Sequence, residues 1–525
     1  MKLQIKDTFN KKLPADPILE NTRRQVHNSC FSYVNPVKPK RAELVHASEK
    51  FAKQLGLNVV DLKSKEFLDI VTGNKILENT KPYAMCYGGH QFGNWAGQLG
   101  DGRATNLFEI IHDNERWAWQ LKGAGPTPYS RSADGLAVLR SSIREHLCSE
   151  AMHNLGVPTT RSLSLALSGE QVMRDVEYNG NPSYEKGAIV CRVSPSFIRF
   201  GNFEILASRG EVDTLKKLMD YTIDEFYPQF ESGTTKGYLD FFRKVVENTL
   251  DMVIHWQRVG FVHGVMNTDN MSIHGLTIDY GPYGWLEGYD PDWTPNTTDK
   301  QFKRYRFGNQ PQIALWDLYK LAIAIHPLIG ETKELEEILA DYHTNFDIKY
   351  LEMMRSKLGL QKNNSSDLGL IQGLENLLQI TETDMTIFFR NLSEISKNNN
   401  GEEGELGCLD QINDAFYKQE ELRGDVITKW KSWFSFYLDR LKLEEVSDFE
   451  RKKAMNMVNP KYVLRNYMAQ MAIDNAENGN YNLIHEFYDL LQNPYSEQEN
   501  YQKWFAKRPE WARNKVGSSM LSCSS

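Results

Sequence analysis

A group of oxygen-bearing side chains stands out in the middle of the chain. The segment FVHGVMNTDN (261–270) ends in Asp269 and Asn270, and Asp279 follows nine residues later. Mg²⁺ prefers hard oxygen ligands, and proteins often hold it with one or two side chains that leave coordination sites for phosphate oxygens and water. A carboxylate and an amide at this spacing therefore predict a magnesium–phosphate site at Asn270 and Asp279.

The same segment follows the pattern of a protein-kinase catalytic loop, H-R-D-L-x-x-x-N, with one telling difference. His263 takes the place of the histidine, Asn270 that of the metal-binding asparagine, and Asp279 opens a D-Y-G triplet where kinases have D-F-G. Val265 stands where a kinase has its catalytic aspartate, and valine cannot accept a proton. Asp269 is the nearest candidate base. Transfer of the γ-phosphoryl group is therefore not the default prediction, and a polar turn after a core helix is the plain alternative.

A kinase-like site also needs a strand lysine on the phosphates and a helix carboxylate that orients it. Lys122 ends the alternating segment RWAWQLK, on the face opposite the tryptophans. Glu145 lies in the middle of an expected helix, off its apolar stripe. This order predicts a phosphate contact by Lys122 with Glu145 as its partner. A strand-end lysine and a solvated glutamate are the open alternatives.

Glycines and arginines elsewhere in the chain extend this prediction. The segment GDGR, from Gly100 to Arg103, can bring backbone N–H groups and a guanidinium close to phosphate, because glycine allows close approach. It is not a Walker loop. Arg192 and Arg199 could clamp an anion by paired hydrogen bonds, although each alone is more often a surface or salt-bridged arginine.

These residues need elements that position them. Alternation of apolar and polar residues predicts strands over 116–122 and 189–194. Apolar spacing predicts helices over 42–55 and 134–154, the second beginning at the cap-like pair Asp134-Gly135.

Helices dominate the sequence from about residue 210. A loop-rich stretch covers 267–311, and polar, small-residue breaks fall at 362–367 and 397–407, before a helical module at roughly 410–494. A strand-rich segment followed by a helical one predicts an α+β protein with two lobes and a cleft between them.

The composition limits the class of protein. The chain has 525 residues, 41% of them hydrophobic, which is enough for two or three domains. The net charge of −8 favours neither nucleic acid nor acidic membrane as a partner. No apolar run approaches the roughly 18 residues of a membrane span, and the start lacks a signal or transit pattern. Six cysteines without a CxxC pair fit a reducing compartment. We therefore expect a cytoplasmic protein.

Several long blocks of the sequence resemble the selenoprotein O family. They are GHQFGNWAGQLGDGR, QLKGAGPTPYSR, DGLAVLRSSIREHLCSEAMHNLGVPTTR, RVSPSFIRFGNFE, FVHGVMNTDNMSIHGLTIDYGPYG and VNPKYVLRNYMAQMAI. The resemblance covers nearly the whole chain and implies a bilobal protein-kinase-like (pseudokinase) fold with protein adenylyltransferase activity. Family members bind ATP in a flipped orientation, transfer AMP to Ser, Thr or Tyr hydroxyls of proteins and release pyrophosphate.

Carried over residue by residue, the resemblance implies a complete site. Asp269 would be the proton acceptor, and Asn270 and Asp279 would bind Mg²⁺, with Mn²⁺ as an alternative. Lys122 would contact phosphate, with Glu145 as its helix partner. The remainder of the ATP site would consist of Gly100, Gly102, Arg103, Asp134, Gly135, Arg192 and Arg199.

The resemblance also implies an organisation and partners. An N-terminal extension would cover 1–80, a kinase-like N-lobe with the nucleotide-binding loops 81–205, a helical C-lobe with the metal site 206–400, and a helical C-terminal module with the tail 408–525. The acceptors would be protein hydroxyls, with those of the enzyme itself among the candidates. We expect a monomer that binds neither nucleic acid nor membrane.

Two other functions would use the same ATP site: a protein or small-molecule kinase, and a non-catalytic nucleotide-binding pseudokinase. The tail raises a separate point. Some family members carry selenocysteine at the position of Cys523, and some bacterial relatives pair this tail cysteine with one in the activation segment. Here that segment, GYDPDWTPNTTD (288–299), has Pro295 at the corresponding place. A redox latch of that kind is therefore not expected, and a free thiol on the tail is the plain alternative.

Overall fold

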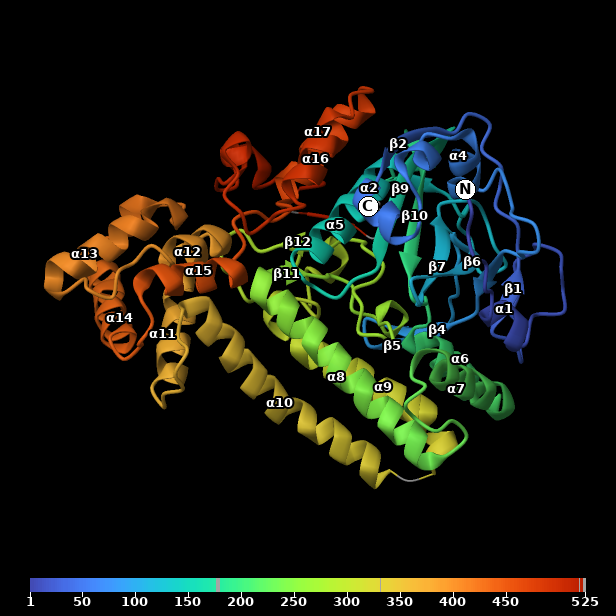
Figure 1. Ribbon diagram of the computed structural model, residues 1–525, viewed down its shortest axis with the longest axis horizontal. Helices are drawn as coiled ribbons and strands as arrows, with labels where there is room; N and C mark the ends of the chain where they lie inside the picture. The colour runs from blue at the N-terminus through green and yellow to red at the C-terminus, as the bar shows by residue number, and fades with distance from the viewer. Residues whose placement is uncertain (176–179, 331, 519, 523–525) are drawn as a thin grey trace.

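The computed structural model describes residues 1–175, 180–330, 332–518 and 520–522 (Figure 1). It confirms the predicted α+β class, because a large sheet in the first 194 residues precedes a mainly helical remainder. Cys523, which the sequence singled out, lies outside the described residues.

The described strands of the first part form an eight-stranded antiparallel sheet in the order β1-β3-β6-β7-β10-β9-β2, with β8 paired to β10. Their bounds are β1 (Phe31–Tyr33), β2 (Glu43–Ala47), β3 (Tyr83–Met85), β6 (Ala104–His112), β7 (Glu115–Lys122), β8 (Ala137–Val138), β9 (Arg161–Arg174) and β10 (Ser183–Ser194). Two small pairs lie apart from it, namely β4 (Gly88–Gln91) with β5 (Asn94–Gln98), and β11 (Phe261–Val262) with β12 (Gly284–Trp285).

The helices form two groups in the sequence, one within the part that contains the sheet and one after it. Those within the first part are α1 (Phe9–Lys12), α2 (Glu49–Gln54), α3 (Val59–Leu62), α4 (Lys65–Val71) and α5 (Leu139–Asn154). Those after it are α6 (Phe200–Ser208), α7 (Val212–Phe226), α8 (Thr235–Val259), α9 (Gln310–Ile329), α10 (Lys333–Leu358), α11 (Asp367–Ile380), α12 (Met385–Leu392), α13 (Gly401–Ile412), α14 (Asp425–Leu441), α15 (Asp448–Val458), α16 (Asn466–Glu477) and α17 (Asn482–Leu490).

The two faces of the sheet have different partners, and this places Lys122. On one face Trp119 and Leu121 of β7 are fully buried in a cluster with Phe51 and Phe67 of α2 and α4. On the other face α5 packs along β9 and β10, with Ile143 buried in the main core. Side chains alternate along a strand, so Lys122 points from β7 to the face that carries α5. The predicted strand over 116–122 is confirmed.

Three predicted element bounds are wrong, each for a local reason. The helix expected over 42–55 is strand β2 up to Ala47, which pairs with β9, and α2 begins only after Ser48, whose side chain accepts from the Phe51 N–H. The helix expected from 134 begins at Leu139, because Gly135 has φ +74°, outside the helical region. The break expected at 397–407 is mostly helical, since α13 begins at Gly401.

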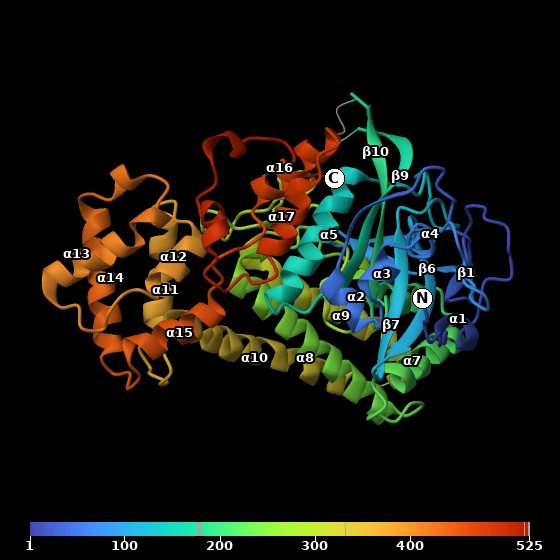
Figure 2. The same cartoon turned by 45° about the horizontal axis from the view of Figure 1, so that its top comes forward.

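The C-terminal helices reach back to the sheet. Helices α16 and α17 pack against α5, on its side away from β9 and β10 (Figure 2). Helices α11 to α14 gather at the opposite end of the molecule from the sheet (Figures 1 and 2). Helix α5 is therefore held from both sides, by the sheet and by the end of the chain.

Candidate nucleotide-binding and catalytic site

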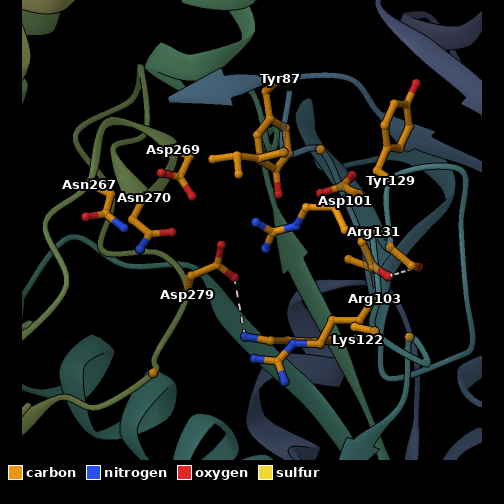
Figure 3. Close-up of a pocket in the computed structure, with 18 of the residues that line it drawn as sticks. Tyr87, Asp101, Arg103, Lys122, Tyr129, Arg131, Asn267, Asp269, Asn270 and Asp279 are labelled. Atoms are coloured by element: carbon orange, nitrogen blue, oxygen red, sulfur yellow. Dashed lines mark hydrogen bonds and ion pairs between the residues drawn. The ribbon is translucent and has the colours of Figure 1, made fainter. Parts of the chain in front are cut away.

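A cavity of about 730 Å³ lies between the sheet and the loop that follows β11. Figure 3 shows Asp269, Asn270 and Asp279 on one wall, Lys122 facing Asp279, and Arg103 across the cavity. Of the residues predicted from the sequence, the lining includes Gly100, Gly102, Arg103, Lys122, Asp134, Gly135, Arg192, Arg199, Asp269, Asn270 and Asp279. Glu145 does not line the cavity but is buried behind Lys122.

The glycines of the GDGR segment allow this loop to pack closely on its neighbour. Gly100 has φ +73°, and a Cβ on it would lie 2.4 Å from the Tyr129 ring. A Cβ on Gly102 would lie 3.0 Å from the Tyr129 carbonyl oxygen. Side chains at either position would push the loop away from residues 127–130, and with it the wall that carries Arg103.

Lys122 and Glu145 form the ion pair that their positions on strand and helix predict. Lys122 Nζ lies 2.7 Å from Glu145 Oε2 and 3.4 Å from Asp279 Oδ1. Arg192 Nη1 lies 3.0 Å from Glu145 Oε1 and also pairs with Asp279. The solvated-glutamate alternative is therefore wrong for Glu145, which is 2% exposed.

Three basic side chains of the cavity meet at the Asp279 carboxylate. The carboxylate receives Lys122, Arg192 and Arg199, the last at 2.5 Å from Oδ2. Burial would raise the pKa of Asp279, but the three cations outweigh burial and hold its pKa well below the ordinary range. Its φ of +59° is uncommon for a residue other than glycine, and such strain is often found at functional sites.

Asp269 is covered by the hairpin β4–β5. A Cβ on Gly89 would lie 2.8 Å from Asp269 Oδ1, so the hairpin backbone rests on the carboxylate. Gln91 Nε2 donates to Asp269 Oδ2 over 3.3 Å, while Oδ1 is buried and has no hydrogen-bond partner among the described residues. Burial raises the pKa of Asp269 to about 7, and the nearby Arg199 only partly offsets it. A carboxylate with a pKa near neutrality is suited to act as a general base.

Asn270 and Asp279 have the donor chemistry for a divalent cation. Asn270 Nδ2 donates to the Val265 carbonyl over 3.0 Å, which leaves the amide oxygen for another partner. Among the described residues, no group of three or more His, Cys, Asp or Glu side chains is arranged to hold a metal ion. A carboxylate and an amide fit Mg²⁺ that takes its remaining ligands from phosphates and water.

Asp134 and Gly135 form the outer rim of the cavity. Asp134 makes a two-pronged ion pair with Arg174 of β9, with distances of 2.7 and 2.8 Å. A Cβ on Gly135 would lie 2.3 Å from the Gly125 carbonyl group, so only glycine fits there. Arg174, which lines the cavity, had no signal in the sequence because its partner is 40 residues away.

Other lining residues were also missed. Gln91 lies in the glycine-rich stretch, where the glycines drew attention and its amide did not. Arg131 follows the loop that packs on Gly100. Asn267 lines the cavity and accepts from the Tyr305 hydroxyl over 2.6 Å, a contact between residues 38 apart. These residues reach the site only through the tertiary structure, so no sequence pattern marked them.

The two residues that the sequence matched to the ends of the kinase H-R-D triplet differ in their surroundings. Val265 lines the cavity. His263 is buried, and its Nε2 lies 2.9 Å from the Ile278 carbonyl oxygen, one residue before Asp279. His263 therefore supports the loop and does not face the cavity.

The chain end contacts the segment at 288–299. Leu521 N donates to the Pro295 carbonyl over 2.9 Å, and Thr297 N donates to the Leu521 carbonyl over 2.8 Å. Asn296 in turn donates to the Gly264 carbonyl over 3.0 Å, next to Val265. The tail is thus held at Pro295 by backbone hydrogen bonds.

The cavity is lined by six basic and four acidic side chains. A cavity of this size and charge suits a phosphate-bearing ligand of nucleotide size. The geometry therefore indicates a nucleotide-binding protein. A family profile described as "Protein adenylyltransferase SelO" matches residues 18–493, and the chain therefore belongs to that family. The resemblance stated from the sequence blocks is confirmed.

Curated relatives match over the full length of the chain. Proteins named "Protein nucleotidyltransferase YdiU" are 62% identical in Flavobacterium johnsoniae, 51% identical in Rhodopirellula baltica and 50% identical in Aromatoleum aromaticum. Each match covers 100% of this chain and 99% of the relative. Within the described ranges, no helix is both long and apolar enough to cross a membrane.

Proposed function

We propose that this chain is a protein adenylyltransferase that transfers AMP from ATP to Ser, Thr or Tyr hydroxyls of proteins, its own included. One observation carries the proposal. Asp269 lies buried beside Asn270 in a cation-lined cavity, while Val265 leaves no carboxylate at the position of the kinase base. Membership of the SelO family and the names of the relatives support it.

The proposed fold is a kinase-like (pseudokinase) arrangement of two lobes. The sheet with α5 would be the N-lobe and the helices from α6 onward the C-lobe, with the cavity between them. The Lys122–Glu145 pair between a strand and a helix, and the Asn270 and Asp279 pair on the opposite wall, support this assignment. The boundaries at 80, 205 and 400 belong to the same proposal, as do a monomeric state and a cytoplasmic location.

Asn270 and Asp279 would hold Mg²⁺, which would offset the negative charge of the phosphates when bound. Lys122, Arg192 and Arg199, which are buried and meet at Asp279, would supply positive charge for the triphosphate. The glycine-rich wall at Gly100 and the rim at Asp134 would enclose the rest of the nucleotide.

Asp269 would take the proton of the acceptor hydroxyl. The hydroxyl oxygen bonds to the α-phosphorus, the bond between that phosphorus and the oxygen bridging to the β-phosphate breaks, and pyrophosphate leaves with the electron pair. Oδ1 of Asp269 makes no hydrogen bond within the described residues, and it would take the proton once the acceptor reaches it past the hairpin at Gly89. Gln91 keeps the other oxygen engaged.

Two labelled forms of ATP test the proposal. Incubation of the purified protein and a lysate acceptor with α-labelled ATP should label protein, release pyrophosphate and leave a mass increment of AMP on a hydroxyl residue. Label transferred from the γ-position would mean a kinase and would contradict AMP transfer. Thermal stabilisation by ATP with no label from either position would contradict it in favour of a non-catalytic nucleotide-binding protein.

A further inference from the structure

A second cavity, of about 470 Å³, lies among helices of the C-terminal part, apart from the nucleotide cavity. Its walls come from α8, the start of α9, α10, α11 and the loop around residue 289. The two cavities share no lining residue. The segment from Asp279 to Tyr289, which includes β12, contributes lining residues to both cavities.

Aromatic rings form most of the apolar wall. The lining includes Tyr289, Phe307, Tyr342, Phe346 and Tyr350. The Tyr289 and Phe307 rings meet edge to face with centroids 6.3 Å apart, and the Phe346 and Tyr350 rings stack at 5.5 Å. The rings therefore hold one another in place, and aromatic faces attract cations through their quadrupole.

A carboxylate from α11 is set among these rings. Glu375 Oε1 accepts from the Tyr350 hydroxyl and, over 3.5 Å, from the Tyr289 hydroxyl. Both tyrosines use the same oxygen, and within the described part of the chain Oε2 has no hydrogen bond. Burial raises the pKa of Glu375, and the hydrogen bonds from the two tyrosine hydroxyls only partly offset this effect. None of the interactions that shift this pKa comes from a cation.

The charge of this cavity is opposite to that of the nucleotide cavity. Glu375, Asp347 and one histidine, His343, line it, and no lysine or arginine is among the described lining residues. The nucleotide cavity, in contrast, is lined by five arginines and one lysine. A half-buried carboxylate surrounded by aromatic rings, without a cation of the protein's own, lacks the partner that such groups usually have.

We propose that this cavity binds an organic cation, an alkylammonium or guanidinium group, with Glu375 as its counter-ion and the tyrosine and phenylalanine rings as its walls. A guanidinium or ammonium head would donate to Glu375 Oε2 and lie against the aromatic faces. The same chemistry occurs in a lysine or arginine side chain of a protein and in a free amine. The proposal does not depend on AMP transfer, since it concerns a separate cavity.

Direct binding to the full-length protein tests it without ATP. Nα-acetyl-arginine methyl ester and Nα-acetyl-citrulline methyl ester, whose α-amines are blocked and uncharged, are titrated in parallel and followed by calorimetry and tyrosine fluorescence. The two probes match in length and differ in the guanidinium charge. Binding of the arginine ester that exceeds that of the citrulline ester, and that weakens with added salt, is expected. Equal signals from both probes would overturn the proposal.

Two variants connect the binding to the cavity. Glu375→Gln keeps the side-chain shape and an oxygen for both tyrosine hydroxyls, and it should weaken binding of the arginine ester by about tenfold. Glu352→Gln, on the exposed face of α10, removes one charge without touching the cavity and should bind as the parent does. Loss of affinity to the same extent in both variants would show a general charge effect and contradict the site.

A stability measurement shows whether a variant loses binding only because it is less stably folded. Unfolding temperatures of the parent and Glu375→Gln proteins should agree within a few degrees, and Phe346→Leu should weaken binding through the aromatic wall alone. If Phe346→Leu and Glu375→Gln both bind like the parent, the cavity is not the site. An arginine-containing peptide and agmatine then distinguish the sources. Tighter binding of the peptide indicates a protein side chain, and tighter binding of agmatine a free amine.

Discussion

Gln91 donates from Nε2 to Oδ2 of Asp269 over 3.3 Å and joins a hairpin of the first part of the chain to a loop 178 residues later. Its neighbours add to this contact, since the His90 N–H donates to Thr268 Oγ1 over 2.7 Å. The hairpin β4–β5 thus covers the proposed base and engages one of its two oxygens.

Removing this contact should affect catalysis more than nucleotide binding. Gln91→Ala takes away one hydrogen bond to Asp269, which is worth about 0.5–1.5 kcal/mol and corresponds to a roughly 2- to 13-fold lower kcat. KM for ATP should hardly change. Steady-state kinetics of AMP transfer measure both values. Asn94→Ala, at the exposed end of the same hairpin, is the control and should keep the parent kcat. A kcat equal in the two variants would contradict a positioning role.

The two aspartates should separate chemistry from binding. Asp269→Ala should lower turnover by about 100-fold or more, because a general base is lost, and leave metal-dependent nucleotide affinity nearly intact. Asp279→Ala should abolish metal-dependent nucleotide binding, because a metal ligand is lost. Calorimetric titration with Mg-ATP, paired with turnover of α-labelled ATP, compares them. Equal loss of nucleotide affinity in both variants would refute this division.

Glu145→Gln should weaken both the fold and the ATP site. It leaves Lys122 and Arg192 without one carboxylate in a buried setting, and breaking such a pair typically costs about 3–5 kcal/mol. Chemical unfolding measures the stability loss and calorimetry the ATP affinity. Glu150→Gln is the matched control, because Glu150 lies on the same helix and makes a buried pair with Arg161 at 2.8 Å. It should lose stability while keeping ATP affinity.

Buried histidines at α5 should make the stability of the protein depend on pH. His46 Nδ1 lies 2.8 Å from His146 Nε2, and burial lowers the pKa of His146 to about 3. Because the folded pKa lies below the unfolded value of about 6.5, the unfolded chain binds more protons below pH 6.5. Stability should therefore fall as the pH drops from about 6.5, by about 1.4 kcal/mol per pH unit for each such histidine.

Urea unfolding at pH 7 and at pH 5.5 measures this slope. Because the unfolded histidine is only partly protonated over this range, His146→Gln should lose about 1.2 kcal/mol less than the parent in total between these two pH values. His274, whose pKa burial lowers to about 4, contributes equally to both proteins and cancels in the comparison. Parallel pH profiles for the two proteins would contradict the assignment.

Local patterns in the sequence were enough to predict part of the fold. The alternation in RWAWQLK was enough to place Trp119 and Lys122 on opposite faces of a strand, because a strand has a period of two whatever surrounds it. Helix α5 was expected from its apolar stripe, but its start was misplaced. The left-handed Gly135 and the pairing of Ala137 with Ala188 of β10 depend on segments far along the chain.

The sequence by itself determined the chemical inventory of this protein: the Asp269-Asn270 pair, Asp279, the valine at 265 and the blocks of its family. Only the tertiary structure decided how these groups are used. Burial of Asp269 under Gly89, its hydrogen bond from Gln91, and the three cations on Asp279 each join residues far apart in the chain. No local pattern encodes such contacts, because they arise only when the sheet, α5 and the loop after β11 pack together.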